Sequence, residues 1–223
     1  MSTIEYNLEG KAALVTGAGG GIGSAAAELL GKAGARVFLA DFQEESLSRV
    51  AGELKAKSIE CSYLAQDITQ PGAPQRLVDA AAKKWGTVDI LVNSAGINRP
   101  QKAEDVTEEN WDAVLNINLR ALFLVSQAAG KLMIAQGGGR IVSISSQTGT
   151  VAIPLRAAYC SSKAAVDALT RSLALEWAPY NVTVNAVAPT FVETPFVTEM
   201  FKDADFKQYV LDSIPLGRLA TPL

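Results

Sequence analysis

The chain has 223 residues, of which 48% are hydrophobic and 19% are charged, and its formal net charge is −3. This length is enough to bury one core, so we expect a single domain over residues 1–223, and because no basic stripe runs along it we expect no nucleic acid and no membrane as partner. With no histidine and only Cys61 and Cys160, we expect no metal site and no disulfide framework, and a reducing cytoplasm as the location.

Short apolar runs rich in β-branched residues predict buried strands at 12–16, 36–40, 88–93, 140–145 and 182–188, with a weaker strand within 58–65. Between the strands lie stretches with helical spacing of apolar residues, such as Val166, Leu169, Leu173 and Trp177. This alternation is typical of βαβ units. We therefore expect an α/β fold of the Rossmann type, a doubly wound parallel sheet with helices on both faces.

The segment TGAGGGIG (16–23) follows the first predicted strand and opens a predicted helix. Its glycines fit a G-x-x-x-G-x-G spacing through Gly17, Gly21 and Gly23, and such a loop lets the backbone approach a diphosphate at the start of a helix. A glycine turn without a ligand is the alternative interpretation. The loop indicates a dinucleotide site.

The second predicted strand is followed by Asp41, at the distance from the loop where a carboxylate binds an adenosine ribose. Its charge repels a 2′-phosphate, and neither Gly20 nor Phe42 nor Gln43 offers a compensating cation. We expect NAD as cofactor in preference to NADP. An ordinary solvated residue at a strand end or helix start is the alternative for Asp41.

The segment YCSSK places Tyr159 and Lys163 four residues apart, on one face of a helix. A nearby ammonium and an oxidised nicotinamide both favour the phenolate of a tyrosine, so we expect the lysine, with the cofactor, to draw the pKa of the tyrosine toward the working range. Such a phenol moves a proton on or off an alcohol oxygen while hydride moves at the adjacent carbon. Ser145 or Ser146, at the end of the strand predicted at 140–145, is placed to stabilise the alkoxide. An exposed Tyr and Lys without a role are the alternative.

In their order and spacing these motifs resemble the short-chain dehydrogenase/reductase family, from about residue 8 to the last residue. The resemblance implies an adenine contact at Asp67 and Ile68, and a cofactor motif at NSAG (93–96), in which Ser94 replaces the second asparagine of the family. It also implies that Lys163 binds the nicotinamide ribose. The expected cofactor contacts are Gly17, Gly21, Ile22, Gly23, Asp41, Asp67, Ile68, Asn93, Ala95, Gly96, Tyr159, Lys163, Pro189, Val192 and Thr194.

The resemblance also implies a catalytic tetrad of Asn118, Ser146, Tyr159 and Lys163, in which the asparagine holds a water that links the lysine to solvent. The substrate contacts that it implies are Ser146, Gln147, Arg156 and Tyr159, and the pocket is completed by Asn98, Ile153, Phe191 and Glu193.

This pocket is polar and carries one cation, which favours a polyol, sugar or sugar acid as the substrate. Either Arg156 or Arg99 is suited to pair with the carboxylate of a sugar acid. A surface arginine bound to nothing is the alternative for each.

Two other functions stay open. A reductase of 3-oxoacyl thioesters on a carrier protein usually prefers NADP and has basic residues near the position of Tyr180, where this chain reads EWAPYN. A dinucleotide-binding sensor or scaffold without catalysis is the alternative from another class, and the complete tetrad is against it.

Two departures from the family pattern stand out. Thr190 replaces the usual glycine after the last predicted strand, and the chain stops after IPLGRLATPL, so the last helix and strand of the family are expected to be absent. Helices at about 108–135 and 157–178, whose surfaces we expect to carry Ala121, Ala128, Ala164 and Ala168, pair in this family across two-fold axes. The resemblance implies a homodimer or homotetramer.

Overall fold

The computed structural model describes residues 6–222, which contain one six-stranded sheet in the order β3-β2-β1-β4-β5-β6 with every neighbouring pair parallel. The strands are β1 (Ala12–Thr16), β2 (Arg36–Asp41), β3 (Cys61–Ala65), β4 (Ile90–Asn93), β5 (Gly139–Ile144) and β6 (Val182–Val187). All six predicted strands are present. The expected doubly wound α/β fold is confirmed.

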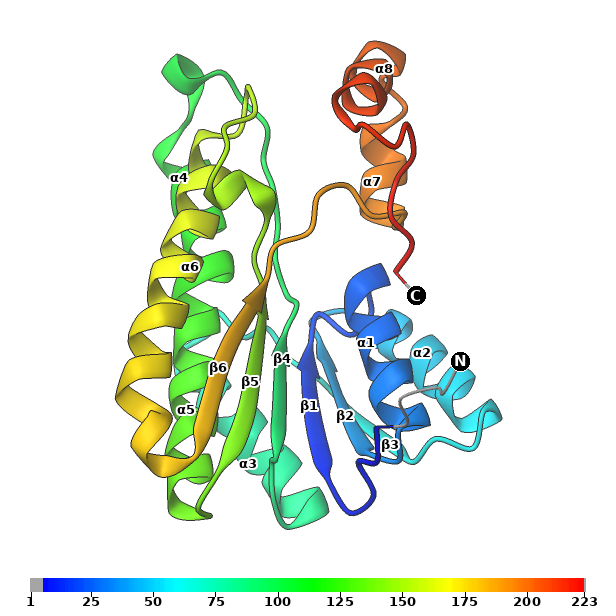
Figure 1. Ribbon diagram of the computed structural model, residues 1–223, viewed down its shortest axis with the longest axis vertical. Coiled ribbons are helices and arrows are strands. Elements are labelled where there is room, and N and C mark those ends of the chain that lie inside the picture. Colours follow the sequence, from blue (N-terminus) through cyan, green and yellow to red (C-terminus); the bar gives the residue numbers. More distant parts are fainter. Residues whose placement is uncertain (1–5, 223) are drawn as a thin grey trace.

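Helices cover both faces of the sheet (Figure 1). One face packs against α1 (Gly21–Lys32) and α2 (Glu44–Ala56), and the other against α3 (Ala73–Trp85), α5 (Leu122–Ala135) and α6 (Ala157–Trp177). Along β1, Ala13 and Val15 face the first layer while Leu14 faces the second, so every residue of this strand is buried. Double coverage explains why the central strands read as continuous apolar runs.

The edge strand β6 differs from the centre. Val182 and Val184 pack toward α6, whereas the side chains that alternate with them, Thr183, Asn185 and Val187, are exposed. The alternation shows that β6 is covered on one face only within the described residues.

The predicted helix at 108–135 is a continuous helical run with an internal irregularity. It comprises α4 (Glu108–Leu115), a π-helical stretch at Asn116–Ala121 and α5, and the hydroxyl of Thr107 accepts the amide of Asn110 at its start. By length and hydropathy the run would suffice to cross a membrane, but half of its most apolar window is buried in the protein, as expected of a helix that covers a sheet. π-Helical turns inside α-helices are frequent at functional sites, and this one contains Asn118.

The small residues expected on the surfaces of these helices divide into two groups. Ala164 and Ala168 of α6 are exposed, but Ala121 and Ala128 are buried against the core. The expectation was wrong for the latter two, because they lie on the side of their helix that faces the sheet.

After β6 the chain forms a small helical unit that lies beyond the carboxyl ends of the strands (Figure 1). It contains α7 (Pro195–Met200) and α8 (Ala204–Ser213), and α7 begins where the hydroxyl of Thr194 accepts the amide of Val197 at 3.3 Å. The rings of Phe191, Phe201 and Phe206 have centroids 6.0 to 6.3 Å apart and hold this unit together.

Candidate active site

A cavity of about 480 Å³ opens at the carboxyl ends of the central strands, beside the point where the strand order reverses between β1 and β4. Ligands of open α/β sheets bind at such a point. The site residues predicted from the sequence that line this cavity are Gly17, Gly21, Ile22, Asp41, Asp67, Ile68, Ala95, Gly96, Tyr159, Lys163 and Thr194.

The glycine loop has a steric reason at each predicted position. Gly17 has a φ of +65°, and a Cβ there would lie 2.6 Å from the amide nitrogen of Ala95. A Cβ on Gly21 would lie 2.5 Å from Cγ2 of Thr194, and one on Gly23 would clash with the carbonyl of Gly17. Gly20 caps α1 without a side-chain hydrogen bond. Free amides at a helix start and a backbone cleared of side chains fit a dinucleotide diphosphate.

Asp41 is held at the edge of the cavity by two backbone amides. Its Oδ2 accepts the amide of Gly19 at 3.1 Å, and its Oδ1 accepts that of Gln43 at 3.2 Å. Gln43, and not Asp41, is the capping residue of α2. The carboxylate is therefore fixed at the wall of the cavity, where it can accept a further hydrogen bond.

Arg49, which the sequence did not indicate as a site residue, also contacts the glycine loop. Nη2 of Arg49 donates to the carbonyl of Gly19 at 3.4 Å, and its Nη1 donates to Glu53 at 2.8 Å. Arg49 is eight residues beyond Asp41 and on the next helix, so only the packing of α2 against the loop brings it near.

Asp67 accepts hydrogen bonds from the amide and hydroxyl of Thr69, at 2.9 and 2.7 Å, and from Gln70 at 3.0 Å. Hydrogen bonds from Gln70 and Thr69 hold the pKa of Asp67 below its usual value. The side chain thus shapes the turn after β3, and its neighbour Ile68 is buried against the cavity.

Four predicted cofactor contacts do not line this cavity. Asn93 is buried below it, where its Nδ2 donates to Ser126 at 2.9 Å, because it ends a strand that is covered on both faces. Gly23 packs inside the loop. Pro189 and Val192 line the smaller pocket described below, since the chain after β6 passes over that end of the site.

Lys163 and Asn118 meet beneath Gly96. A Cβ on Gly96 would lie 3.2 Å from Oδ1 of Asn118 and 3.8 Å from Nζ of Lys163. The amide group of Asn118 exchanges two hydrogen bonds with the backbone of Ile97, at 2.8 and 2.9 Å, and also donates to Ser162 at 3.1 Å. Nζ of Lys163 donates to the carbonyl of Ile144 at 2.7 Å. The π-helical stretch and the first turns of α6 are thereby tied to the end of β5.

Burial dominates the electrostatics of the pair on α6. Desolvation lowers the pKa of Lys163 to about 8, although Asp167 opposes the shift. Burial also raises the pKa of Tyr159, and Ser146 and Arg156 oppose this only in part. Nζ of Lys163 lies 5.6 Å from the centroid of the Tyr159 ring. Desolvation of the phenolate outweighs these protein groups, and the lowering expected from Lys163 together with an oxidised nicotinamide stays a prediction.

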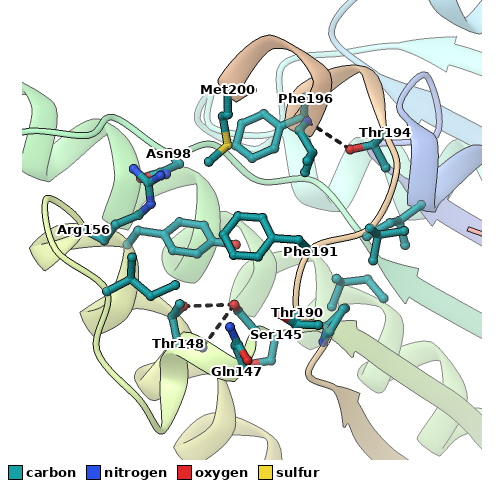
Figure 2. Close-up of a pocket in the computed structure, with 18 residues that line it drawn as sticks. Asn98, Ser145, Gln147, Thr148, Arg156, Thr190, Phe191, Thr194, Phe196 and Met200 are labelled. Atoms are coloured by element: carbon teal, nitrogen blue, oxygen red, sulfur yellow. Dashed lines mark hydrogen bonds between the residues drawn. The ribbon is translucent and has the colours of Figure 1, made fainter. Parts of the chain in front are cut away.

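A second pocket, of about 120 Å³, adjoins the first (Figure 2). All four predicted substrate residues line it, Ser146, Gln147, Arg156 and Tyr159, together with Asn98, Ile153 and Phe191. Oγ of Ser146 accepts the amide and the hydroxyl of Thr148 at 3.2 and 3.0 Å, and Oγ of Ser145 donates to the carbonyl of Lys163 at 3.3 Å. Tyr159 lines both cavities, so a molecule in one can meet a molecule in the other at its side chain.

Two expectations about this pocket were wrong. Glu193 is exposed and does not line it, since its backbone pairs with Ala220 and turns its side chain outward. The pocket is also less polar than expected, because Phe196 and Met200 of α7 form part of its wall. Arg99 lies elsewhere: it lines the larger cavity and donates to Asn110 at 2.6 Å.

Phe196 lines both cavities and was not found from the sequence. The only local signal was the helix start at Thr194-Pro195, which fixes α7 but does not say what α7 covers. Its position depends on the fold of the segment after β6.

Comparison with known proteins agrees with this geometry. A family described as short chain dehydrogenase matches residues 11–205. The chain is 42% identical to an NAD-dependent glycerol dehydrogenase of Listeria innocua and 39% identical to a D-threitol dehydrogenase of Mycolicibacterium smegmatis, in each case over 98% of this chain and 84% of the relative. It is 38% identical to a 3-oxoacyl-acyl-carrier-protein reductase of Thermotoga maritima, over 96% of this chain and 87% of the relative.

Solved structures agree as well. A gluconate 5-dehydrogenase from Burkholderia cenocepacia, in complex with NADP and tartrate, superimposes with a TM-score of 0.92 at 32% identity. The superposition covers 98% of this chain and 86% of that one.

Proposed function

The chain belongs to the short-chain dehydrogenase family and is an NAD(P)-dependent oxidoreductase acting on CH–OH groups. From this premise we propose that it interconverts a small polyol, sugar or sugar acid with the corresponding ketone. We also propose that NAD is the preferred cofactor. The observation that carries the proposal is the position of Tyr159, which lines both the larger cavity and the small pocket. A phenol there reaches the oxygen of a substrate whose carbon faces the dinucleotide.

The residues of the chain have distinct roles in this reaction. During oxidation the phenolate of Tyr159 takes the hydroxyl proton of the substrate, and during reduction the phenol returns it. Ser146 holds the same substrate oxygen by a hydrogen bond. A bound dinucleotide would accept the hydride from the substrate carbon in oxidation and return it in reduction. The products of oxidation are thus a ketone, the reduced dinucleotide and a proton.

Lys163 acts on this reaction through its charge. With a pKa of about 8 it is mostly protonated at neutral pH, and its ammonium near the ring of Tyr159 favours the phenolate. Asn118 positions the strand-end loop at Ile97 against α6, which keeps Lys163 in place.

The preference for NAD follows from Asp41. Its carboxylate is fixed by the amides of Gly19 and Gln43 and would repel a 2′-phosphate. Arg49, beside the glycine loop, favours NADP, but Glu53 pairs with it. The glycerol dehydrogenase of Listeria innocua is named NAD-dependent, whereas the Burkholderia cenocepacia structure holds NADP.

Reduction of 3-oxoacyl thioesters is the second candidate function. The walls formed by Phe191, Phe196 and Met200 suit an acyl chain, and the Thermotoga maritima relative bears that name. The small size of the pocket and the carboxylate of Asp41 favour the first candidate.

We also propose that the protein is a homodimer or homotetramer. Small residues at Ala164 and Ala168 and the largely exposed Leu175 share α6, and Trp111 of the adjacent α4 is 39% exposed. Pairing of these helices between two copies would bury this surface. Light scattering of the purified protein tests the proposal, and a monomer at all concentrations would contradict it.

The test of function is the rate of NADH and NADPH formation with polyols, sugars, sugar acids and 3-hydroxyacyl thioesters, for the native protein and for Tyr159→Phe. We expect turnover of one small polar alcohol with NAD, and a loss of about 10²-fold or more in Tyr159→Phe with binding of NADH retained. Turnover of thioesters alone would select the second candidate. Full activity in Tyr159→Phe would refute the proposed acid/base.

A further inference from the structure

Arg156 is a buried cation without a partner among the described residues. Its side chain is 7% exposed, and within residues 6–222 it makes neither an ion pair nor a side-chain hydrogen bond. The centre of its guanidinium lies 5.3 Å from the centroid of the Phe206 ring, and its N–H groups are left to the cavities that Arg156 lines. Burying an unpaired charge is costly, so such a group is ordinarily matched by an anion.

No carboxylate of residues 6–222 takes that place. Asp203 is the acidic residue that shares a cavity with Arg156, on its outer side, and its Oδ1 accepts the amide of Phe206 at 3.0 Å as the cap of α8. It does not come within 4.0 Å of the guanidinium, as an ion pair would require. Burial accordingly lowers the pKa of Arg156, and only the negative forms of Tyr159 and Cys160 oppose the shift.

The surroundings of Arg156 favour an anion in the small pocket. Arg156 is the residue that precedes α6, a helix of 21 residues whose first amides have no side-chain cap, so the positive end of the helix lies at the same place. Asn98 lines the same pocket, and its Oδ1 is buried without a partner. Figure 2 shows Arg156 and Asn98 at the end of the pocket away from Gln147 and Thr148.

We propose that Arg156 binds a carboxylate of the substrate, so that the substrate class of this enzyme is a small hydroxy acid and not a neutral polyol. Asn98 accepts a hydrogen bond from a hydroxyl of the same molecule. This inference rests on the proposed function, because Ser146 and Tyr159 line the same pocket and hold the reacting hydroxyl.

Charge and size narrow the class. Arg156 is the one cationic side chain lining the pocket, which matches a single carboxylate better than a doubly charged phosphate. The volume of about 120 Å³ is small, so the pocket suits a short acid better than a long chain. Arg156 caps α6 and Tyr159 lies in its first turn, and both side chains line the pocket, so one small acid can contact both.

The experiment compares acids with neutral polyols of equal carbon number: glycerate with glycerol, threonate with threitol, and gluconate with glucitol. We would measure kcat and KM with saturating NAD for the native protein, Arg156→Lys, Arg156→Gln, and Arg171→Gln as the control. Arg171 is an exposed arginine on the same helix, so it reports the effect of removing a charge from α6.

We expect the native protein to prefer the acid in at least one pair. Arg156→Gln should lower kcat/KM for that acid by about 10- to 100-fold through KM, with a change of less than about 3-fold for its neutral partner. Arg156→Lys should retain part of the preference, and Arg171→Gln all of it. A neutral polyol preferred by the native protein, or equal losses for acid and polyol in Arg156→Gln, would overturn the inference while leaving the proposed function intact.

Calorimetric titration of the native protein with the same acids separates the two proposals. If no compound is turned over but acids bind to the native protein and not to Arg156→Gln, the proposed function fails and the anion site stands. If acids neither bind nor react, the inference is overturned whether or not polyols are oxidised.

Discussion

Replacing Lys163 by methionine should stabilise the protein at neutral pH while removing its activity. Lys163 is 4% exposed, and burial lowers its pKa from an ordinary 10.5 to about 8. Methionine keeps the length and apolar character of the side chain but carries no charge. The substitution therefore removes the buried ammonium together with its hydrogen bond to Ile144, and the dependence on pH separates the two effects.

The size of this cost follows from the two pKa values. Each pKa unit corresponds to about 1.4 kcal/mol, so the buried ammonium destabilises the folded state by about 3 kcal/mol at pH 7, about 2 at pH 9 and about 1 at pH 10. The sign follows from proton binding: between the folded pKa of about 8 and the unfolded pKa of 10.5, the unfolded chain holds more protons, so stability rises with pH. Loss of the hydrogen bond to the carbonyl of Ile144 takes back about 1 to 3 kcal/mol at every pH.

The assay is urea unfolding of the native protein and Lys163→Met at pH 7, 8, 9 and 10. The free energy of unfolding of the native protein, relative to that of Lys163→Met, should rise by about 2 kcal/mol between pH 7 and pH 10. Lys131→Met, at an exposed position on α5, is the control and should show no such gain. A difference between native protein and Lys163→Met that stays constant over this range would refute the burial argument.

Three further predictions concern the cofactor site, the helix packing and the acid/base. Asp41→Ser should raise kcat/KM with NADP by about 10- to 100-fold, because it removes the repulsion between the carboxylate and the 2′-phosphate. Adding Arg49→Gln should cancel most of this gain. A gain that survives in the double variant would exclude a role for Arg49. Gly52→Ala, on the open side of α2, should raise the free energy of unfolding by about 0.5 to 1 kcal/mol. Gly130→Ala should lower it by about 1 to 3 kcal/mol, because the new Cβ would lie 2.6 Å from Cη2 of Trp177. Equal effects of the two substitutions on urea unfolding would contradict this packing. Burial raises the pKa of Tyr159, so kcat/KM for alcohol oxidation should rise from pH 7 to pH 10 as the phenolate forms. The kcat/KM for ketone reduction should not rise over this range. Parallel pH profiles for the two directions would argue against Tyr159 as the base.

The sequence by itself determined the sheet and most of the cofactor site. Apolar runs fixed the six strands, since a parallel sheet buried on both faces requires them, and the glycines at 17, 21 and 23 marked the loop because no side chain fits there. Asp41, Ser146, Tyr159 and Lys163 were found for a related reason. Each stands at a strand end or in a short local motif, so chain distance already implies proximity.

Tertiary structure alone decided the rest. It buried Asn93 below the cavity, turned Glu193 outward, brought Arg49 to the loop and placed Phe196 between the two pockets. It also enclosed the phenol of Tyr159, whose pKa this desolvation raises, and left Arg156 buried without an ion pair among residues 6–222. These properties depend on desolvation and on contacts between residues distant along the chain, and no local pattern of residue types carries either of them.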